Sequence, residues 1–313
     1  MKIEIIKSLM NNFKHFVSKD KTVCEVSEYQ ISDHFADVEK TPKNVGKVIL
    51  ITGATSGIGN ASLGRLVKDG HIVYGTYRKK EESKLVSDLG GISVHMEMTE
   101  EDSLKKAVKK IISEQGHIDV LWNNAGYGLY GPMEDIPMES ARHEFDVNLF
   151  GLARLTQLVL PYMRKAKKGL IINTSSVGGK VYMPLGAWYH ASKHALEGWS
   201  DCMRLDLKQF GINVVILEPG LIETNFYAVA QNSCPAGSQN GPYKKIVRAM
   251  QRSVEHGVKG SPPELIADTV SKIVSSENPK TRYLVGKFAR PLVFIRKWFG
   301  DRMYDRVIMA RFK

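Results

Sequence analysis

Short apolar runs alternate with longer stretches of helical periodicity along most of the chain. Val48–Ile51 is a continuous apolar run of the kind that forms a buried parallel strand. Similar runs predict strands at 72–74, 92–94, 118–121, 170–172 and 214–216, and the intervening sequence predicts helices ending near Gly70 and over 143–162 and 189–210. Such alternation predicts βαβ units with right-handed crossovers. The expected fold is therefore α/β, a doubly wound (Rossmann-type), mostly parallel sheet with helices on both faces.

The same pattern divides the chain into one domain with two extensions. Residues 1–46 form an N-terminal extension in which apolar side chains recur at helical spacing, at Ile3, Ile6, Met10, Phe13 and Val17. The strand–helix series occupies 47–287 and includes a long segment at about 226–262. Residues 288–313 are a basic tail of amphipathic character.

Composition and charge narrow the classes of protein. Hydrophobic residues make up 43% and charged residues 25%, which is typical of a globular protein. We see no apolar run long enough for a membrane span and no signal peptide, and the three cysteines are widely spaced. We therefore expect a cytoplasmic protein without a metal site. The net charge is +11, but ten Lys/Arg against two Asp place +8 of it in 280–313. This concentration favours a local surface role over nucleic-acid binding.

A glycine-rich turn, Thr52–Gly59, connects the first strand to the first helix. A pyrophosphate needs free backbone N–H groups at a helix N-terminus and no Cβ atoms in its way. Gly53, Gly57 and Gly59 meet that demand. A tight βα turn without a ligand would also use glycines, but the position at the start of a βαβ series favours a dinucleotide site.

The end of the second predicted strand distinguishes the two nicotinamide cofactors. An acidic side chain there would bind the ribose hydroxyls of NAD, whereas an arginine would bind the 2′-phosphate of NADP. The sequence has Tyr77, Arg78 and Lys79, with no carboxylate before Glu81. We expect NADP(H) to be preferred through Arg78, with NAD(H) as the other possibility; Arg78 could also be a solvated loop cation.

Six motifs in order make residues 47–225 resemble the short-chain dehydrogenase/reductase family. They are Gly53-x₃-Gly57-x-Gly59, Asn123-Asn124-Ala125-Gly126, Asn148, Ser175-Ser176, Tyr189-x₃-Lys193 and Pro219-Gly220-x₃-Thr224. The stretches around Ser176 and Tyr189 look like the hydroxysteroid and retinol dehydrogenase branch. The resemblance also implies that the long segment at about 226–262 is the substrate loop, and that the protein forms a homo-oligomer, a dimer or a tetramer.

By this resemblance a set of residues contacts the cofactor. The glycine-rich turn is expected to bind the pyrophosphate. Asn124 to Gly126 are expected to flank the adenine ribose, and residues 219–224 to border the nicotinamide. The family often has Asp where Glu97 stands, so the contact at the adenine is expected to differ. The full expected set is Gly53, Thr55, Ser56, Gly57, Ile58, Gly59, Arg78, Glu97, Met98, Asn124, Ala125, Gly126, Tyr189, Lys193, Pro219, Gly220, Ile222 and Thr224.

Tyr189 and Lys193 are the candidate chemical centre. They stand at i and i+4 on a predicted helix, so they share one face. A nearby cation lowers the pKa of a phenol, which suits Tyr189 as the acid/base of a carbonyl reduction. Such a pair also arises by chance on helix surfaces. Ser176 precedes Tyr189 by thirteen residues, and its hydroxyl could hold the substrate oxygen. The resemblance assigns Asn148 to a water in the proton relay.

Aromatic and apolar side chains gather near these motifs, which favours a bulky lipophilic substrate. They include Tyr127, Leu129, Tyr130, Val181, Tyr182, Met183, Trp188, Tyr227, Pro235 and Tyr243. We expect an NADP(H)-dependent oxidoreductase that interconverts a secondary alcohol and a ketone on a steroid-like molecule. Simple core packing could explain many of these residues. The alternatives are a 3-oxoacyl-thioester reductase and, without catalysis, a dinucleotide-sensing or scaffold protein.

The tail mixes Leu292, Phe294, Trp298 and Phe299 with arginines and lysines. A basic amphipathic segment can lie on an anionic membrane. It can equally close the substrate pocket or pack against another subunit. We expect one of these packing roles, with peripheral membrane contact as the alternative.

Overall fold

The computed structural model describes residues 46–255 and 259–312. The N-terminal extension predicted over 1–46 therefore lies, apart from Gly46, outside the described residues.

A parallel sheet forms the centre of the fold, as predicted, and it has seven strands. The strands are β1 (Val48–Ile51), β2 (Ile72–Tyr77), β3 (Ile92–His95), β4 (Val120–Asn123), β5 (Gly169–Thr174), β6 (Ile212–Pro219) and β7 (Arg282–Val285). Their order across the sheet is β3-β2-β1-β4-β5-β6-β7. The order reverses between β1 and β4, and this reversal is the switch point at which open α/β sheets bind ligands.

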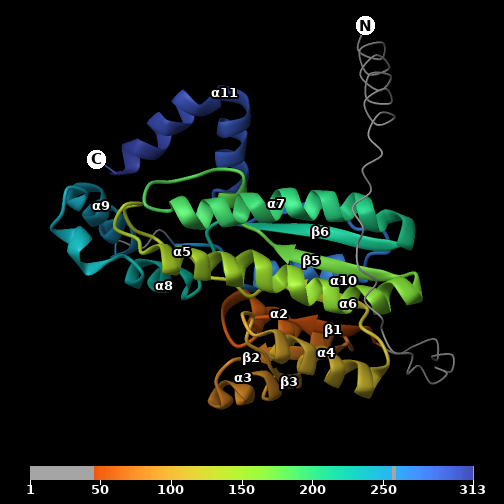
Figure 1. Ribbon diagram of the computed structural model, residues 1–313. Coiled ribbons are helices and arrows are strands. Elements are labelled where there is room, and N and C mark those ends of the chain that lie inside the picture. Colours follow the sequence, from red (N-terminus) through yellow and green to blue (C-terminus); the bar gives the residue numbers. More distant parts are fainter. Residues whose placement is uncertain (1–45, 256–258, 313) are drawn as a thin grey trace, which may run out of the picture. The chain divides into compact units, whose positions relative to one another are not determined.

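Helices cover both faces of the sheet (Figure 1). They are α2 (Gly57–Lys68), α3 (Ser83–Ser87), α4 (Glu101–Gln115), α5 (Met138–Phe145), α6 (Leu152–Ala166), α7 (Ala187–Leu207), α8 (Phe226–Asn232), α9 (Lys244–Glu255), α10 (Glu264–Ser275) and α11 (Ala289–Met309).

Strand β1 shows why the sheet has a core on each side. Its four residues are all buried, and they alternate between the two faces because side chains of a strand point in opposite directions in turn. Val48 and Leu50 join the core formed with α4, α6 and α7. Ile49 and Ile51 join the core formed with α2 and α10. A continuous apolar run is thus what a strand covered on both faces requires.

Two predicted elements differ in the structure. The helix expected over 143–162 is present but is not a single α-helix: α5 ends at Phe145, a π-helical turn spans Asp146–Gly151, and α6 follows. Such turns occur inside α-helices and are frequent at functional sites. Strand β7 was not predicted from the sequence, because its residues are only half-buried at the sheet edge and include Arg282.

The C-terminal part is mainly helical. The long segment at 226–262 contains α8, a short 3₁₀ helix at Ala236–Gln239 and α9. Helix α11 bends sharply at Gly300, whose φ of 72° and ψ of −176° are not helical, and Figure 1 shows its two halves running in different directions. Among the helices that the structure describes, we find none with the length and apolarity to cross a bilayer.

Candidate active site

The turn between β1 and α2 presents a helix N-terminus to the switch point. Ser56 precedes the helix in an extended conformation, and neither a side-chain cap nor an acidic residue occupies the first turn of this fully described helix. The first N–H groups of α2 are therefore available to an anionic group, which the positive end of the helix dipole also favours.

Close backbone approach explains the glycines of this turn. A Cβ on Gly59 would lie 2.2 Å from the carbonyl oxygen of Gly53, so only glycine lets the helix start against the turn. Gly57 has a φ of +53°, and a Cβ there would lie 3.2 Å from Cγ2 of Thr224. The turn and the segment after β6 thus meet across a narrow space. Because these positions exclude side chains, the turn fits the pyrophosphate of a dinucleotide.

Thr52 and Asn124 fix the shape of the turn. The Thr52 hydroxyl accepts the backbone N–H groups of Asn124 and Ala125, both at 2.9 Å. In return, Nδ2 of Asn124 donates to the carbonyl oxygens of Thr52 at 3.0 Å and Gly53 at 3.1 Å. The side chain of Asn124 is thus engaged with the turn itself. Thr52 was not among the predicted site residues, although its place at the end of a buried strand could have indicated this role.

Arg78 follows β2 directly and is exposed, as are Lys79 and Lys80. The carboxylate of Glu82 accepts the backbone N–H groups of Arg78 and Lys79, each at 3.2 Å, so it organises the backbone here. Glu97 lies after β3, where its N–H donates to the hydroxyl of Ser103. Met98, beside it, is buried.

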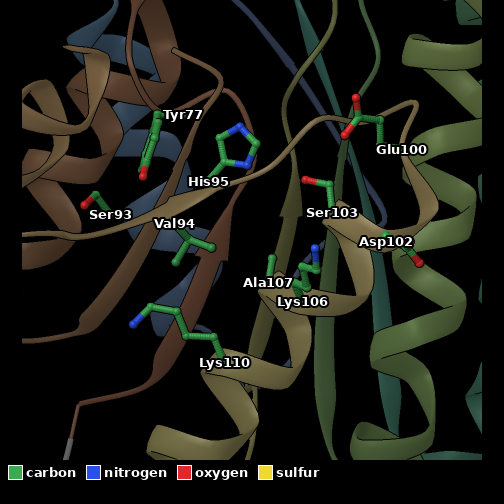
Figure 2. Close-up of a pocket in the computed structure, with 10 residues that line it drawn as sticks. All are labelled: Tyr77, Ser93, Val94, His95, Glu100, Asp102, Ser103, Lys106, Ala107 and Lys110. Atoms are coloured by element: carbon green, nitrogen blue, oxygen red, sulfur yellow. The ribbon is translucent and has the colours of Figure 1, made fainter. Parts of the chain in front are cut away.

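A cavity of about 390 Å³ lies beside the ends of β2 and β3 and the start of α4, and Figure 2 shows the residues that line it. On one side of it the rings of Tyr77 and His95 pack edge to face, with their centroids 5.6 Å apart. Lys106 and Lys110 extend from α4 on the other side. None of the four predicted catalytic residues lines this cavity, so it lies apart from the chemical centre.

Helix α7 carries Tyr189 and Lys193 on its buried face. The Tyr189 side chain is only 6% exposed, and the Ser176 hydroxyl lies near enough to lower the pKa of its phenol. Ser176 stands after β5 at the start of a 3₁₀ turn, where its Oγ accepts the N–H of Gly178 at 2.9 Å. The fold thus brings together three of the predicted catalytic residues from two elements.

Lys193 is held at the carboxyl end of β5. Its Nζ donates to the carbonyl oxygen of Thr174 at 2.9 Å. A Cβ on Gly126 would lie 3.5 Å from this Nζ and 2.9 Å from Oδ1 of Asn148, so the loop after β4 closes against both residues.

Asn148 sits in the π-helical turn with its amide fully engaged. Oδ1 accepts the N–H of Tyr127 at 3.1 Å, and Nδ2 donates to the carbonyl oxygen of Tyr127 at 2.9 Å and to the hydroxyl of Ser192 at 3.1 Å. This side chain therefore ties the loop after β4 to helix α7. Its expected role at a water stays a prediction.

The acidity of Tyr189 differs from the sequence expectation. Burial raises the pKa of the phenol above its ordinary value, and the nearby Ser176 hydroxyl opposes that rise. Lys193 was expected to lower this pKa, but its ammonium is bonded to Thr174 instead. Since burial favours the neutral phenol, Tyr189 is set up to hold its proton until an acceptor arrives.

Burial also acts on Lys193 and on a neighbouring carboxyl group. It lowers the pKa of the Lys193 ammonium to about 8, against the attraction of Glu144 and Glu197. Glu144 is fully buried in α5, and burial raises its pKa to about 7. One of its oxygens accepts the N–H of Leu129 at 2.8 Å, and the other has no hydrogen-bond partner among the described residues. The sequence reasoning did not identify Glu144.

His190 connects the catalytic helix to the loop that precedes it. Its Nε2 accepts the N–H of Met183 at 3.1 Å, so its Nδ1 carries the proton and donates to the carbonyl oxygen of Gly178 at 2.9 Å. Burial lowers the pKa of this imidazole to about 4, which keeps it in the neutral form that these bonds require. It therefore bridges the loop before α7 to the 3₁₀ turn after β5.

Apolar and aromatic groups surround the phenol. The ring of Tyr189 lies 5.6 Å from that of Tyr130 and 5.3 Å from that of Phe226. Met183, Leu185, Ala230 and Met250 complete the cluster. Phe226 begins α8, so the long segment after β6 reaches the chemical centre, as its predicted substrate role requires.

The segment after β6 also borders the turn. Gly220 donates its N–H to the carbonyl oxygen of Val285 at 2.7 Å, which ties the end of β6 to β7. Ile222 is buried, and Thr224 accepts the N–H of Phe226 at 3.3 Å while it faces Gly57. The segment predicted to border the nicotinamide therefore lies between the turn and the aromatic cluster, and its contact with a cofactor stays a prediction.

Three comparisons with known proteins agree with this geometry. The chain is 38% identical over 260 residues to a 3-ketodihydrosphingosine reductase of Bacteroides thetaiotaomicron, covering 82% of this chain and 94% of the relative. It is 32% identical over 282 residues to an NADPH-dependent 3-dehydrocapnine reductase of Ornithobacterium rhinotracheale, covering 84% and 96%. The crystal structure of a short-chain dehydrogenase from Streptomyces avermitilis superposes with a TM-score of 0.69 at 27% identity, covering 82% and 97%.

The family model that matches is that of the short chain dehydrogenases, over residues 47–233. This range holds β1 to β6, the glycine turn and all four predicted catalytic residues. The match, the relatives and the seven-stranded parallel sheet agree, and the chain is a member of the short-chain dehydrogenase/reductase family of oxidoreductases.

Proposed function

We propose that the protein reduces the ketone of a lipophilic substrate to a secondary alcohol with NADPH, using Tyr189 as the proton donor. The observation that carries this proposal is the buried phenol of Tyr189, which lies near the Ser176 hydroxyl and one helical turn from Lys193. A reduced nicotinamide, when bound, supplies the hydride to the carbonyl carbon.

The chain's own residues handle the oxygen. The Ser176 hydroxyl is placed to hold the carbonyl oxygen beside the phenol. As negative charge develops on that oxygen, Tyr189 donates its proton to it and is left as phenolate. Lys193 then stabilises the phenolate, because at neutral pH a lysine whose pKa is about 8 is mostly ammonium.

NADP(H) is the proposed cofactor because the chain has cations where NAD enzymes have a carboxylate. Arg78, Lys79 and Lys80 follow β2 and are exposed to a ligand there. The NADPH dependence of the relative that reduces 3-dehydrocapnine supports the same choice.

Replacing Arg78→Asp removes the phosphate partner and adds a carboxylate, so the ratio of kcat/KM for NADPH over NADH should fall at least about tenfold. Lys84→Asp, an exposed cation on α3, is the matched control and should leave the ratio unchanged; an unchanged ratio in Arg78→Asp would overturn the assignment.

We propose a long-chain 3-keto lipid as the substrate class. Tyr130, Phe226 and Met183 give the reacting phenol an apolar surround. The names of both relatives denote reduction of a ketone or dehydro group at carbon 3. The steroid-like ketone expected from the sequence has the same apolar character and belongs in the same test, together with a 3-oxoacyl thioester.

The test is NADPH oxidation by the purified protein with these three substrate classes and a small water-soluble ketone. We expect the highest kcat/KM with the long-chain 3-keto lipid. A preference for the steroid or the thioester would overturn the substrate class and leave the reaction intact. Tight NADPH binding without turnover of any ketone would favour the dinucleotide-sensing alternative.

A further inference from the structure

The first half of α11 exposes a cluster of large aromatic side chains. Phe294 is 55% exposed, Trp298 68% and Phe299 59%. The ring of Phe294 lies beside the other two, with centroids 6.3 Å from that of Trp298 and 6.1 Å from that of Phe299. Exposed aromatic rings gathered in this way form a patch that usually marks an interaction site.

A basic groove begins at the foot of the same helix. It has a volume of about 760 Å³ and lies between α10, β7 and the start of α11. Its apolar lining includes Leu265, Tyr283 and Val285. Its cations are Lys272, Lys280, Arg282, Lys287 and Arg290, and no Asp or Glu stands among the described residues that line it.

One of these cations is already neutralised. Arg282 bonds Glu197 at 3.1 Å and Glu218 at 3.2 Å, and also pairs with Asp201. The remaining four are lysines and an arginine on exposed positions around the groove. The groove therefore carries a net positive charge toward solvent.

The aromatic patch and the groove form one continuous surface. Arg290, Phe294 and Trp298 stand at i, i+4 and i+8 of α11, so they share one face of the helix. Arg290 lines the groove, and the two rings extend the same face away from it. We call this surface, made of Lys272, Lys280, Lys287, Arg290, Phe294, Trp298 and Phe299, the α11 face.

We propose that the α11 face docks the protein on an anionic phospholipid bilayer. Tryptophan and phenylalanine side chains partition into the interfacial region of a bilayer, where the apolar ring is buried among acyl chains and headgroups. Lysines and arginines beside them are attracted to anionic headgroups. The aromatic cluster on α11 fits the apolar interfacial region, and the four exposed cations that line the neighbouring groove fit the anionic headgroups.

The other half of α11 connects this face to the substrate side of the site. Tyr304 and Ile308 are buried against Val181. The Tyr304 hydroxyl donates to the carbonyl oxygen of Tyr182 at 2.9 Å, and Tyr182 donates to Asp305 at 2.9 Å. Met183, the next residue, belongs to the apolar cluster around Tyr189. Docking would thus bring the bilayer beside the approach to the phenol; this last step rests on the proposed function, whereas docking itself does not.

Vesicle binding tests the proposal without any turnover. The full-length protein is mixed with vesicles of phosphatidylcholine alone or with phosphatidylglycerol, and binding is followed by co-sedimentation. We expect binding that requires the anionic lipid and weakens with salt. Phe294→Ala/Trp298→Ala should weaken the partition at least about tenfold. Phe150→Ala, a similarly exposed phenylalanine at 59% beside α6, is the matched control and should bind as the parent does.

A second readout identifies the contacting residue. All four tryptophans lie in the described part of the chain. Trp298 is exposed to solvent, whereas the other three are buried or half-buried. Brominated acyl chains should therefore quench its fluorescence, and Trp298→Phe should abolish most of that quenching. Reversing charge by Lys272→Glu or Arg290→Glu should weaken binding by about fivefold or more each.

Three results would overturn the proposal. One is full-length protein that does not bind anionic vesicles. Another is equal binding by the Phe294→Ala/Trp298→Ala variant, which would place the lipid contact elsewhere on the chain. The third is a dimer in sedimentation velocity that this variant alone disrupts, without vesicle binding, which would make the α11 face a subunit interface. Turnover of a water-soluble ketone by the double variant separates these outcomes from a failure of the proposed function.

Discussion

Two regions border the candidate active site and present different chemical groups to it: the turn from β1 to α2 and the segment from α8 to α11. The turn offers backbone N–H groups. Its positions 57 and 59 require glycine, because a Cβ there would come too close to Thr224 or Gly53. The C-terminal segment offers apolar side chains such as Phe226 and Met250. Backbone recognition tolerates few residues, whereas many apolar residues can line the same pocket. The sequence therefore indicates the type of reaction more clearly than it indicates the substrate.

The largest effect is expected at the chemical centre. Replacing Tyr189→Phe removes the proton donor and keeps the ring, so turnover should fall by about 10²–10⁴-fold. NADPH affinity, measured by fluorescence titration, should change little because the turn and Arg78 are untouched. Tyr227→Phe is a control, since this phenol is also buried nearby but is not assigned a proton transfer. Turnover near the parent value in Tyr189→Phe would refute the proposed acid.

A second effect concerns stability and comes from Glu144. Burial raises the pKa of this carboxyl group to about 7, so between its ordinary value and pH 7 the folded state binds more protons than the unfolded state. The folded protein is therefore destabilised as pH rises through that range. Glu144→Gln retains the acceptor for Leu129 and removes the ionisation. The variant should gain stability relative to the parent between about pH 5 and about pH 8, by up to about 3 kcal/mol.

Urea unfolding at several pH values measures this gain. Glu139→Gln, an exposed glutamate of the same helix, should show no such pH dependence. An equal difference between Glu144→Gln and the parent at pH 5 and pH 8 would contradict the account. Catalytic assays of the same variant then show whether the carboxylate also affects Lys193, whose pKa it raises against burial.

The smallest effect is expected on the substrate side. Phe226→Ala removes a ring 5.3 Å from that of Tyr189. The loss should raise KM for a long-chain ketone by about tenfold, equivalent to about 1–3 kcal/mol of apolar contact. A small ketone, which does not reach that ring, should keep its kcat/KM. Equal losses for both substrates would mean that Phe226 supports the site's structure instead of selecting its ligand.

The positions of many candidate site residues could be predicted because each motif reflects a local requirement, either a close approach of backbone atoms or a fixed spacing along a helix. Gly59 is required by the carbonyl oxygen of Gly53, and Tyr189 and Lys193 are fixed by helical spacing. The continuous run Val48–Ile51 predicted a strand covered on both faces, and it is one. These features depend on neighbours along the chain.

Features that depend on distant neighbours were missed. Strand β7 contains Arg282, whose partners Glu197, Asp201 and Glu218 come from α7 and β6. The π-helical turn lies between two α-helices without a break in the helical backbone, and the end of α5 was not predicted from the sequence. Glu144 looks like any glutamate of a polar helix until the loop at Leu129 covers it. The upward shift of the Tyr189 pKa likewise depends on burial, which spacing alone does not give.

The central claim is that Tyr189 protonates a ketone that NADPH reduces. The most direct measurement is the rate of NADPH oxidation with a long-chain 3-keto lipid, by the parent protein and by Tyr189→Phe side by side. The account predicts steady turnover by the parent, formation of the corresponding secondary alcohol, and loss of turnover with NADPH binding retained in the variant. Equal turnover by both proteins, or NADPH oxidation without alcohol formation, would contradict it.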